Sequence, residues 1–280
     1  MSGDAKVGAA GVLEDEGSRP GDRWRAGIEA AALPEELRRK SSDARVGLTP
    51  DRFRFRPEED ATKPVRPSRR RALEALPEGG TVLDVGCGAG ASSLGLAAKA
   101  GLIIGFDRIE AMLEAFAETA AELGVEVRAV LGTWPEVATE AGTADVVVCH
   151  HAMYGVAEVE DFVMALTAAA RHRVVLELSE HPPQSGLEPL WKAIHGIDRP
   201  RRLVADEAQA VLSALGLAVE REDFVVPPQP TEVTEEVVAI VRGRLMVGPE
   251  RDAEIADLLR ARVPSEHRVA ALWWPGAALA

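Results

Sequence analysis

The sequence predicts an α/β fold in which a doubly wound, mostly parallel sheet has seven strands. Short apolar runs alternate with helical stretches along the middle of the chain. These runs are continuously hydrophobic, which is typical of strands that are buried on both faces. The first run leads into three glycines at alternate positions, Gly86, Gly88 and Gly90. Such a turn joins a strand to a helix at the ligand site of doubly wound folds.

The N-terminal part of the chain is expected to lie outside this sheet. Residues 1–22 are rich in small and acidic residues without periodicity, so they are expected to form a disordered tail. Residues 23–78 are expected to form a helical arm. Apolar spacing predicts helical structure over 23–39, broken by a proline, and Ser68 is expected to cap a helix that runs to residue 76. Four prolines between these helices predict an irregular crossing segment.

Residues 79–280 are expected to form the sheet domain. The expected strands are 81–85, 102–106, 125–131, 145–149, 173–178, 217–226 and 268–274. The expected helices are 91–99, 109–123, 135–141, 159–170, 188–194, 206–215, 235–245 and 251–260. Two insertions are expected to elaborate the domain, a substrate lid at about 179–204 and a helical insertion near the C-terminus at about 231–262. Long segments inside compact domains are usually functional or mobile.

The glycine turn and the second apolar run together predict a nucleoside site. Glycines let a bulky ligand approach the backbone, and Asp107 at the tip of the second strand can accept hydrogen bonds from both ribose hydroxyls. Gly86, Gly88 and Ala91 also satisfy the dinucleotide pattern G-x-G-x-x-G/A, so a nicotinamide cofactor is an alternative. Asp84, two residues before the first glycine, would repel a pyrophosphate and would suit a cationic ligand. This position favours a cofactor without a pyrophosphate.

These features resemble the class I S-adenosylmethionine-dependent methyltransferases. Residues 84–90 resemble the family's D-x-G-x-G-x-G motif, and Asp107 resembles its acidic second motif. Residues 132–136 and 145–156 resemble the ends of its third and fourth strands. The resemblance covers about residues 69–224. It implies a Rossmann-like methyltransferase fold with a late antiparallel hairpin beside the fifth strand, and S-adenosylmethionine as cofactor.

The resemblance also implies a set of cofactor contacts. The methionine end of the cofactor is expected near Asp84 and its ribose on Asp107, while the family often has an aspartate at the position of Thr133 to bond the adenine. No metal is implied. The full set of expected cofactor-binding residues is Asp84, Gly86, Cys87, Gly88, Asp107, Arg108, Thr133, Trp134 and His150.

Three residues after the fourth strand are candidates for catalysis, His150, His151 and Tyr154. Histidine titrates near neutral pH and could take a proton from the methyl acceptor, and the tyrosine could orient a substrate hydroxyl. The alternatives are that His150 lies along the cofactor and that the other two side chains pack under the loop. Glu177 and Glu180, near the end of the fifth strand, could bind a substrate amine or cap a helix.

The charge of the chain bears on its substrate. The formal net charge is −13, and nucleic-acid binders normally carry an excess of Lys and Arg. A small-molecule acceptor methylated on oxygen or nitrogen is therefore expected, with an RNA or protein acceptor, or a non-catalytic cofactor-binding subunit, as alternatives. Residues 38–71 dissent, with twelve basic and five acidic side chains. This stretch is interpreted as an arm paired with the acidic remainder, or as a surface that recruits an anionic substrate.

Cysteine usage and hydropathy indicate the compartment. Only Cys87 and Cys149 are present, which argues against a disulfide scaffold and favours a reducing cytoplasm. The two thiols are expected at the tips of neighbouring strands, either as packed side chains or as a pair that forms under oxidation. No apolar run of twenty residues exists, so no membrane association is expected. The C-terminal helices are expected to build substrate specificity or a homodimer contact.

Overall fold

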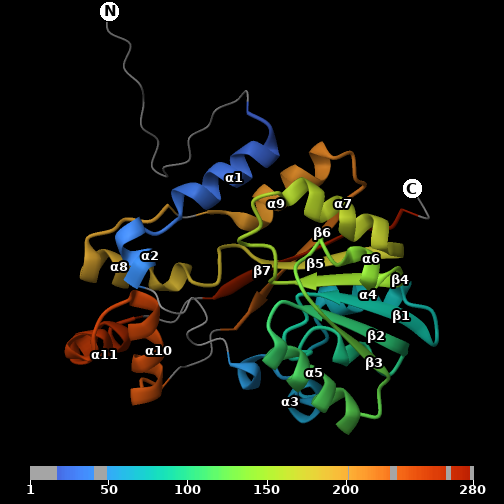
Figure 1. Ribbon diagram of the computed structural model, residues 1–280, viewed down its shortest axis with the longest axis horizontal. Coiled ribbons are helices and arrows are strands. Elements are labelled where there is room, and N and C mark those ends of the chain that lie inside the picture. Colours follow the sequence, from blue (N-terminus) through green and yellow to red (C-terminus); the bar gives the residue numbers. More distant parts are fainter. Residues whose placement is uncertain (1–17, 41–48, 201, 228–231, 263–265, 278–280) are drawn as a thin grey trace, which may run out of the picture.

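The computed structural model describes residues 18–40, 49–200, 202–227, 232–262 and 266–277. A seven-stranded sheet with the order β3-β2-β1-β4-β5-β7-β6 forms its centre (Figure 1). The first five strands pair in parallel, and β7 pairs antiparallel with both β5 and β6. The predicted Rossmann-like fold with its late antiparallel hairpin is therefore confirmed. The strands are β1 (Gly80–Val85), β2 (Ala100–Asp107), β3 (Val127–Leu131), β4 (Ala144–His150), β5 (Ala170–Ser179), β6 (Glu220–Val226) and β7 (His267–Pro275).

Helices cover both faces of the sheet, and a further group extends from one end of it (Figure 1). The α-helices are α1 (Pro20–Ala30), α2 (Glu35–Lys40), α3 (Pro57–Ala61), α4 (Pro67–Ala75), α5 (Glu110–Glu122), α6 (Ala138–Ala141), α7 (Val159–Ala169), α8 (Glu188–His195), α9 (Val204–Ala214), α10 (Glu235–Leu245) and α11 (Asp252–Arg260). Short 3-10 helices are η1 (Pro50–Phe53), η2 (Leu94–Leu96), η3 (Ser185–Leu187) and η4 (Pro249–Arg251). In the described part of the chain, none of these helices has the length and apolar character needed to span a lipid bilayer.

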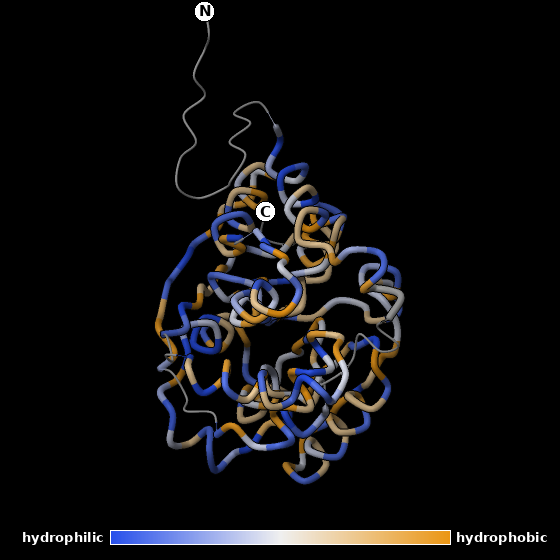
Figure 2. Tube along the Cα trace, turned by 90° about the vertical axis from the view of Figure 1, so that its left-hand side faces the viewer, coloured by the Kyte–Doolittle hydropathy of each residue, from blue (hydrophilic) through white to orange (hydrophobic). Residues whose placement is uncertain are grey.

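Two hydrophobic cores lie on opposite faces of the sheet. One joins the sheet to α1, α7 and α9, and the other joins it to α4 and α5. Neighbouring residues of β1 contribute to different cores, Val82 to the second and Leu83 to the first, and both are fully buried. This explains why the strands read as continuous apolar runs. The helices alternate hydrophobic and hydrophilic turns, as expected where one face covers a sheet (Figure 2).

A third, separate core joins the predicted lid to the predicted helical insertion. Its buried residues come from α8, α10 and α11, and Leu37 of α2 packs against it. Trp191 of α8 lies in this core with 1% of its surface exposed. The tryptophan therefore anchors the helix, as its spacing in the sequence predicts. The core lies beside the sheet, at the end where α2 approaches (Figure 1).

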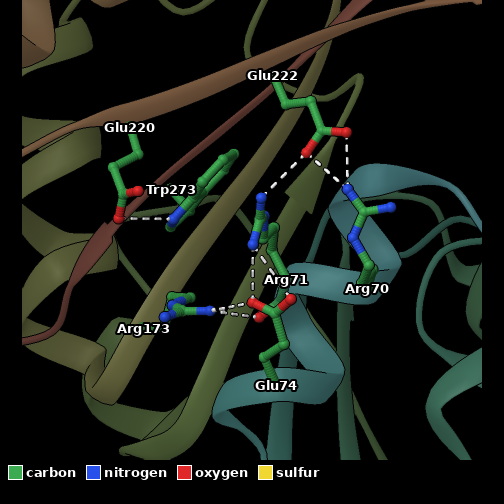
Figure 3. A network of polar contacts seen from close by, with 7 residues as sticks. All are labelled: Arg70, Arg71, Glu74, Arg173, Glu220, Glu222 and Trp273. Atoms are coloured by element: carbon green, nitrogen blue, oxygen red, sulfur yellow. Dashed lines mark hydrogen bonds and ion pairs between the residues drawn. The ribbon is translucent and has the colours of Figure 1, made fainter.

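Helix α4 is attached to the antiparallel edge of the sheet by a polar network (Figure 3). Arg71 donates to Glu222 of β6 and lies 4.4 Å from the ring of Trp273 in β7. Arg70 donates to the same carboxylate at 2.7 Å. The basic arm is therefore held against the acidic sheet edge by named ion pairs. The other members of the network are Glu74, Arg173 and Glu220.

The helix predicted over 91–99 is wrong. Only η2 forms there, within a series of turns. Arg69 donates from Nε to the backbone oxygen of Gly95 at 2.9 Å, and a Cβ at Gly95 would collide with the Arg69 guanidinium. An α-helix would engage that oxygen in its own ladder and would need room for regular side chains. The close approach of the arm therefore replaces the helix that normally follows a glycine loop.

Three further boundaries differ from the predictions. The first helix begins at Pro20, so residues 20–22 are helical and not part of a disordered tail, while residues 1–17 of that tail lie outside the described residues. The helix predicted over 135–141 is reduced to α6. Ser68 does not cap α4, because the helix begins at Pro67 and the Ser68 hydroxyl instead donates to Glu177 of β5. This hydroxyl connects the arm to the candidate site.

Candidate active site

A cavity of about 750 Å³ runs along the edge of the sheet where the parallel strands end. Small-molecule sites commonly measure about 300 to 1,000 Å³, so this cavity lies in the upper part of that range. Its walls follow the strand order, with residues after β3 and β2 at one end, the glycine loop in the middle, and residues of β4, β5 and β7 at the other end. Ligands of doubly wound folds bind at this edge.

The glycine loop forms the floor of the cavity. Gly86 and Gly88 have φ values of 78° and 52°, in the left-handed region that favours glycine. A Cβ at Gly86 would collide with the side chain of Ala152, and one at Gly88 would lie 3.5 Å from Phe53. Both glycines and the intervening Cys87 line the cavity, as predicted. The loop therefore offers bare backbone to a ligand.

Asp107 lies at the end of β2 and lines the cavity. Its Oδ2 accepts a hydrogen bond from the Gly88 N–H at 3.0 Å, and its Oδ1 accepts one from the Ile109 N–H at 3.0 Å. The carboxylate is thereby fixed between the glycine loop and the start of α5. Each carboxylate oxygen can accept a second hydrogen bond, so the pair remains able to bind a vicinal diol.

Arg108, Thr133 and Trp134 line the same end of the cavity. Arg108 and Thr133 are exposed, whereas Trp134 is buried. The indole N–H of Trp134 donates to the backbone oxygen of Phe162 at 3.3 Å, and its ring centroid lies 6.1 Å from that of Phe106. The tryptophan therefore forms a fixed apolar wall, beside which Thr133 supplies an accessible hydroxyl.

Asp84 is the one predicted cofactor-binding residue that does not line the cavity. Its side chain is fully buried on the α4–α5 side of β1, and neither oxygen has a hydrogen-bond partner. Burial raises the pKa of Asp84 to about 7, and the nearby Ser93 hydroxyl offsets the rise in part although its geometry falls short of a hydrogen bond. Strand alternation turns this carboxyl beneath the glycine loop instead of into the ligand space.

His150 ends β4 and lines the cavity. Its Nε2 is shielded from solvent and has no hydrogen-bond partner. Burial lowers the pKa of His150 to about 4, so the ring is neutral at pH 7. A neutral imidazole with an unpaired nitrogen can bind a polar group of a ligand, but it is a weak base.

His151 also lines the cavity, but its ring is held by the protein. Its backbone has a φ of 56°, and its N–H donates to the backbone oxygen of Glu177 at 2.8 Å. The ring Nε2 lies 3.1 Å from Oε1 of Glu177, and Nδ1 lies 2.7 Å from the hydroxyl of Tyr154. Tyr154 itself does not line the cavity. The structure thus brings the two predicted catalytic residues together, with Tyr154 behind the histidine.

Glu177 is the buried charge of this site, with 1% of its side chain exposed. Burial alone would raise its pKa, but the hydrogen bond from His151 and the positive charge of Arg66 lower the pKa of Glu177 below its usual range. Arg66 donates to Oε1 at 2.5 Å, and Ser68 donates to Oε2. The carboxylate is therefore ionised and fully hydrogen-bonded.

Sequence reasoning missed four cavity-lining residues at this end, Arg66, Ser68, Ser179 and His267. The Ser179 hydroxyl lies 3.0 Å from Nε2 of His267 and 3.1 Å from the Tyr154 hydroxyl. A usable signal was Glu177 itself, because a carboxylate inside a strand buried on both faces needs partners. No local signal could place His267, since β7 reaches β5 from the far end of the chain.

The described residues contain no group of three or more side chains that could hold a metal ion. Cys87 and Cys149 are free and buried. They belong to the two cores on opposite faces of the sheet, which accounts for their being packed thiols and not a pair. Burial raises the pKa of both thiols.

Comparison with known proteins relates this site to one family. Residues 82–173, which include the glycine loop, Asp107 and His150, match a family model described as a methyltransferase domain. No curated protein matches the sequence. Among solved structures, the chain is similar to the YcgJ protein from Bacillus subtilis, with a TM-score of 0.50 and 20% identity over 74% of this chain and 98% of that one. This likeness concerns the fold.

Two further solved structures are similar at lower TM-scores. A SAM-dependent methyltransferase from Thiobacillus denitrificans in complex with S-adenosyl-L-homocysteine has a TM-score of 0.49 and 20% identity, over 86% of this chain and 98% of that one. Magnesium protoporphyrin IX methyltransferase from Synechocystis PCC 6803 with bound SAH has a TM-score of 0.48 and 17% identity, over 90% and 92% of the two chains.

Proposed function

Because the chain contains a class I S-adenosylmethionine-dependent methyltransferase domain, we propose that it methylates an oxygen or nitrogen atom of a small-molecule acceptor. The observation that supports this is a single cavity with two chemically distinct ends. One end combines the glycine loop with a carboxylate, and the other combines histidines, a serine and a buried glutamate. S-adenosylmethionine supplies a methyl group on a positively charged sulfur, and the acceptor supplies the nucleophile.

We assign the cofactor to the glycine-loop end. Gly86 and Gly88 would let it lie against the backbone, and the free lone pairs of Asp107 would accept hydrogen bonds from the ribose hydroxyls. Trp134 would wall the base, with Arg108 and Thr133 at its edge. Asp84 acts only through the protein, because its carboxyl lies beneath the loop.

We assign the acceptor to the histidine end. Methyl transfer is an in-line displacement, and holding two reactants in alignment can supply about 7 to 11 kcal/mol of the barrier reduction. His150, with its free nitrogen, can position the acceptor, while His151 is oriented by the ionised Glu177. A location in the cytoplasm stays a prediction that rests on the two free cysteines.

Calorimetry tests the cofactor assignment. S-adenosyl-L-homocysteine should bind with a stoichiometry of one. Asp107→Ala should weaken binding by about 1 to 3 kcal/mol, because the ribose hydroxyls lose their acceptor and the glycine loop loses an anchor. Glu110→Ala, on the exposed start of α5, is the matched control and should bind as the wild type does. Absence of binding by the wild type, with saturable binding of NAD, would contradict the proposal.

A further inference from the structure

A continuous chain of hydrogen-bonding groups crosses the acceptor end of the cavity. Its side chains come from four parts of the fold, namely His151 after β4, Tyr154 in the following loop, Glu177 and Ser179 on β5, and His267 on β7. Successive polar atoms along it are 2.7 to 3.1 Å apart. A chain of this length that faces a cavity is able to move a proton from a ligand into the protein.

The direction of each hydrogen bond follows from the charge of Glu177. An ionised carboxylate only accepts, so Nε2 of His151 carries the hydrogen that lies between them. The Ser179 N–H donates to the Tyr154 oxygen at 2.8 Å. The hydroxyl hydrogen of Tyr154 is therefore directed to Nδ1 of His151 at 2.7 Å or to Oγ of Ser179 at 3.1 Å. Neutral His151 is thus an acceptor at Nδ1.

A proton can reach Nδ1 only through its neighbours, because both ring nitrogens are occupied. Tyr154 does not line the cavity, but Ser179 does. Oγ of Ser179 lies 3.1 Å from the Tyr154 hydroxyl and 3.4 Å from Nδ1 of His151. The serine hydroxyl is therefore the point at which a bound acceptor meets the chain.

The charged state of His151 is accommodated by the same contacts. Once it gains a proton, Nδ1–H donates to Tyr154 and Nε2–H still donates to Glu177, so the imidazolium lies against a buried anion. The other groups that face it are cationic or neutral, namely Arg66 from the arm, His150 from β4 and His267 from β7, with His181 beyond His267. Glu177 offsets Arg66 directly, because the two are bonded at 2.5 Å.

From this geometry we propose that Ser179, Tyr154 and His151 form a proton relay that ends on the Glu177-backed imidazole, and that the acceptor reacts through a hydroxyl oxygen. The inference rests on the proposed function. A neutral hydroxyl is a weak nucleophile and needs to lose its proton during attack, whereas an amine attacks through a lone pair that it already has. A relay that ends in a base therefore suits an oxygen acceptor.

The step balances without any further reactant. The acceptor O–H bond breaks, and its proton passes to Ser179 while Ser179 and Tyr154 hand their own hydrogens onward to Nδ1 of His151. The oxygen forms a bond to the methyl carbon, and the carbon–sulfur bond breaks with its electron pair left on sulfur. Ser179 is the catalytic residue of the relay. Glu177 is a positioning residue that acts through His151, and Arg66 and Ser68 of the arm position Glu177.

The ring nitrogens provide a test that needs no substrate. Nitrogen-15 NMR of the full-length wild type, with His151 assigned by comparison with His151→Gln, should show the hydrogen on Nε2 and a hydrogen-bonded Nδ1 at neutral pH. Tyr154→Phe should change the Nδ1 signal, because it removes the only short contact to that atom. A hydrogen on Nδ1 of neutral His151, or a Tyr154→Phe spectrum identical to wild type, overturns the relay.

The acceptor class is tested with a panel of phenols and alcohols and their amine counterparts, scored by S-adenosyl-L-homocysteine release. Hydroxyl members should turn over. His151→Gln should lower kcat by about 10²- to 10⁴-fold, and Ser179→Ala and Tyr154→Phe should lower kcat with unchanged cofactor KM. Glu177→Gln should move the acidic limb of the kcat–pH profile to lower pH, because the imidazolium loses its counter-charge. Glu180→Gln, a neighbouring carboxylate outside the cavity lining, is the matched control.

The outcomes separate the inference from the function on which it rests. Turnover of amines alone, or hydroxyl turnover with kcat and pH profile unchanged in the variants, overturns the relay and leaves the methyltransferase intact. If the wild type fails to bind S-adenosyl-L-homocysteine in calorimetry, both fail together. If the protein binds this product but no panel member turns over, the ring nitrogen spectra decide the relay alone.

Discussion

The carboxyl of Asp84 makes the stability of the protein depend on pH. In the unfolded chain this group ionises above its ordinary pKa of 3.8, whereas in the buried site its pKa is raised to about 7. An acid whose pKa is raised on folding destabilises the native state increasingly as pH climbs from the lower value to the higher one. Each unit corresponds to about 1.4 kcal/mol, so the upper limit of the loss is about 4 kcal/mol.

Asp84→Asn should remove this dependence. The free energy of unfolding of the variant, relative to the wild type, should rise between about pH 4 and pH 7 and level off above that, since asparagine carries no proton to lose. Urea denaturation at several pH values measures the difference. Asp257→Asn, on the exposed face of α11, controls for the loss of one carboxylate. A difference that stays constant over this pH range would show that Asp84 does not titrate there.

At the scale of single residues, the sequence predicted the lining of the cofactor end but not the partners at the acceptor end. Gly86, Gly88 and Asp107 act where they stand in the chain, so a local motif was sufficient. Ser68 was interpreted as a helix cap because that is the usual local role of serine before a helix. Its hydroxyl binds Glu177 instead, 109 positions along the chain, and no local pattern carries that information.

The segment that contains η1 covers the glycine loop and holds it closed. Arg54 forms a backbone bridge to Gly90, and Phe53 faces Gly88. The Arg54 side chain then extends over α5, donating to Thr119 at 2.9 Å and to Glu118 at 2.8 Å. The arm therefore roofs the part of the cavity that is assigned to the cofactor, and its release would open that part to solvent.

Arg54→Ala should make S-adenosyl-L-homocysteine dissociate faster. The variant keeps the backbone bridge but loses the contacts to α5, and exposed contacts of this type are each worth about 0 to 1 kcal/mol. The dissociation rate should therefore rise by up to about fivefold, while the association rate changes little. Stopped-flow measurements compare it with Arg260→Ala, which removes an exposed ion pair on α11. Equal dissociation rates in the two variants would show that the segment is not a roof.

At the scale of elements, strands were easier to predict than helices. Each of the seven predicted strands overlaps the observed one, because burial on both faces leaves a strong signal in a short run. The segment 91–99 has good helical composition, yet Arg69 claims the backbone oxygen of Gly95 and the helix does not form. Tertiary contact overrode local propensity there, as it commonly does.

Over the whole molecule, an acidic chain carries a basic arm whose charges are satisfied internally. Arg54 pairs with Glu118, Arg66 with Glu177, and Arg70 and Arg71 with Glu222. Arg56, Lys63 and Arg69 pair within the arm itself, with Asp51, Glu59 and Asp60 respectively. These contacts agree with the interpretation of residues 38–71 as an arm that pairs with the acidic remainder. The side chains of 38–40 and residue Arg45 lie outside the described side chains.

This charge arrangement predicts that the protein does not bind single-stranded RNA. Binding would require several cations to exchange carboxylate partners for phosphates, and the net charge of −13 would oppose the approach of a polyanion. Fluorescence anisotropy with a labelled oligouridine at 50 mM salt should show no saturable binding. The double variant Glu118→Gln with Glu222→Gln releases Arg54, Arg70 and Arg71 from their partners and should bind more than the wild type. Tight wild-type binding that weakens steeply with salt would instead identify the arm as a nucleic-acid surface and favour an RNA acceptor.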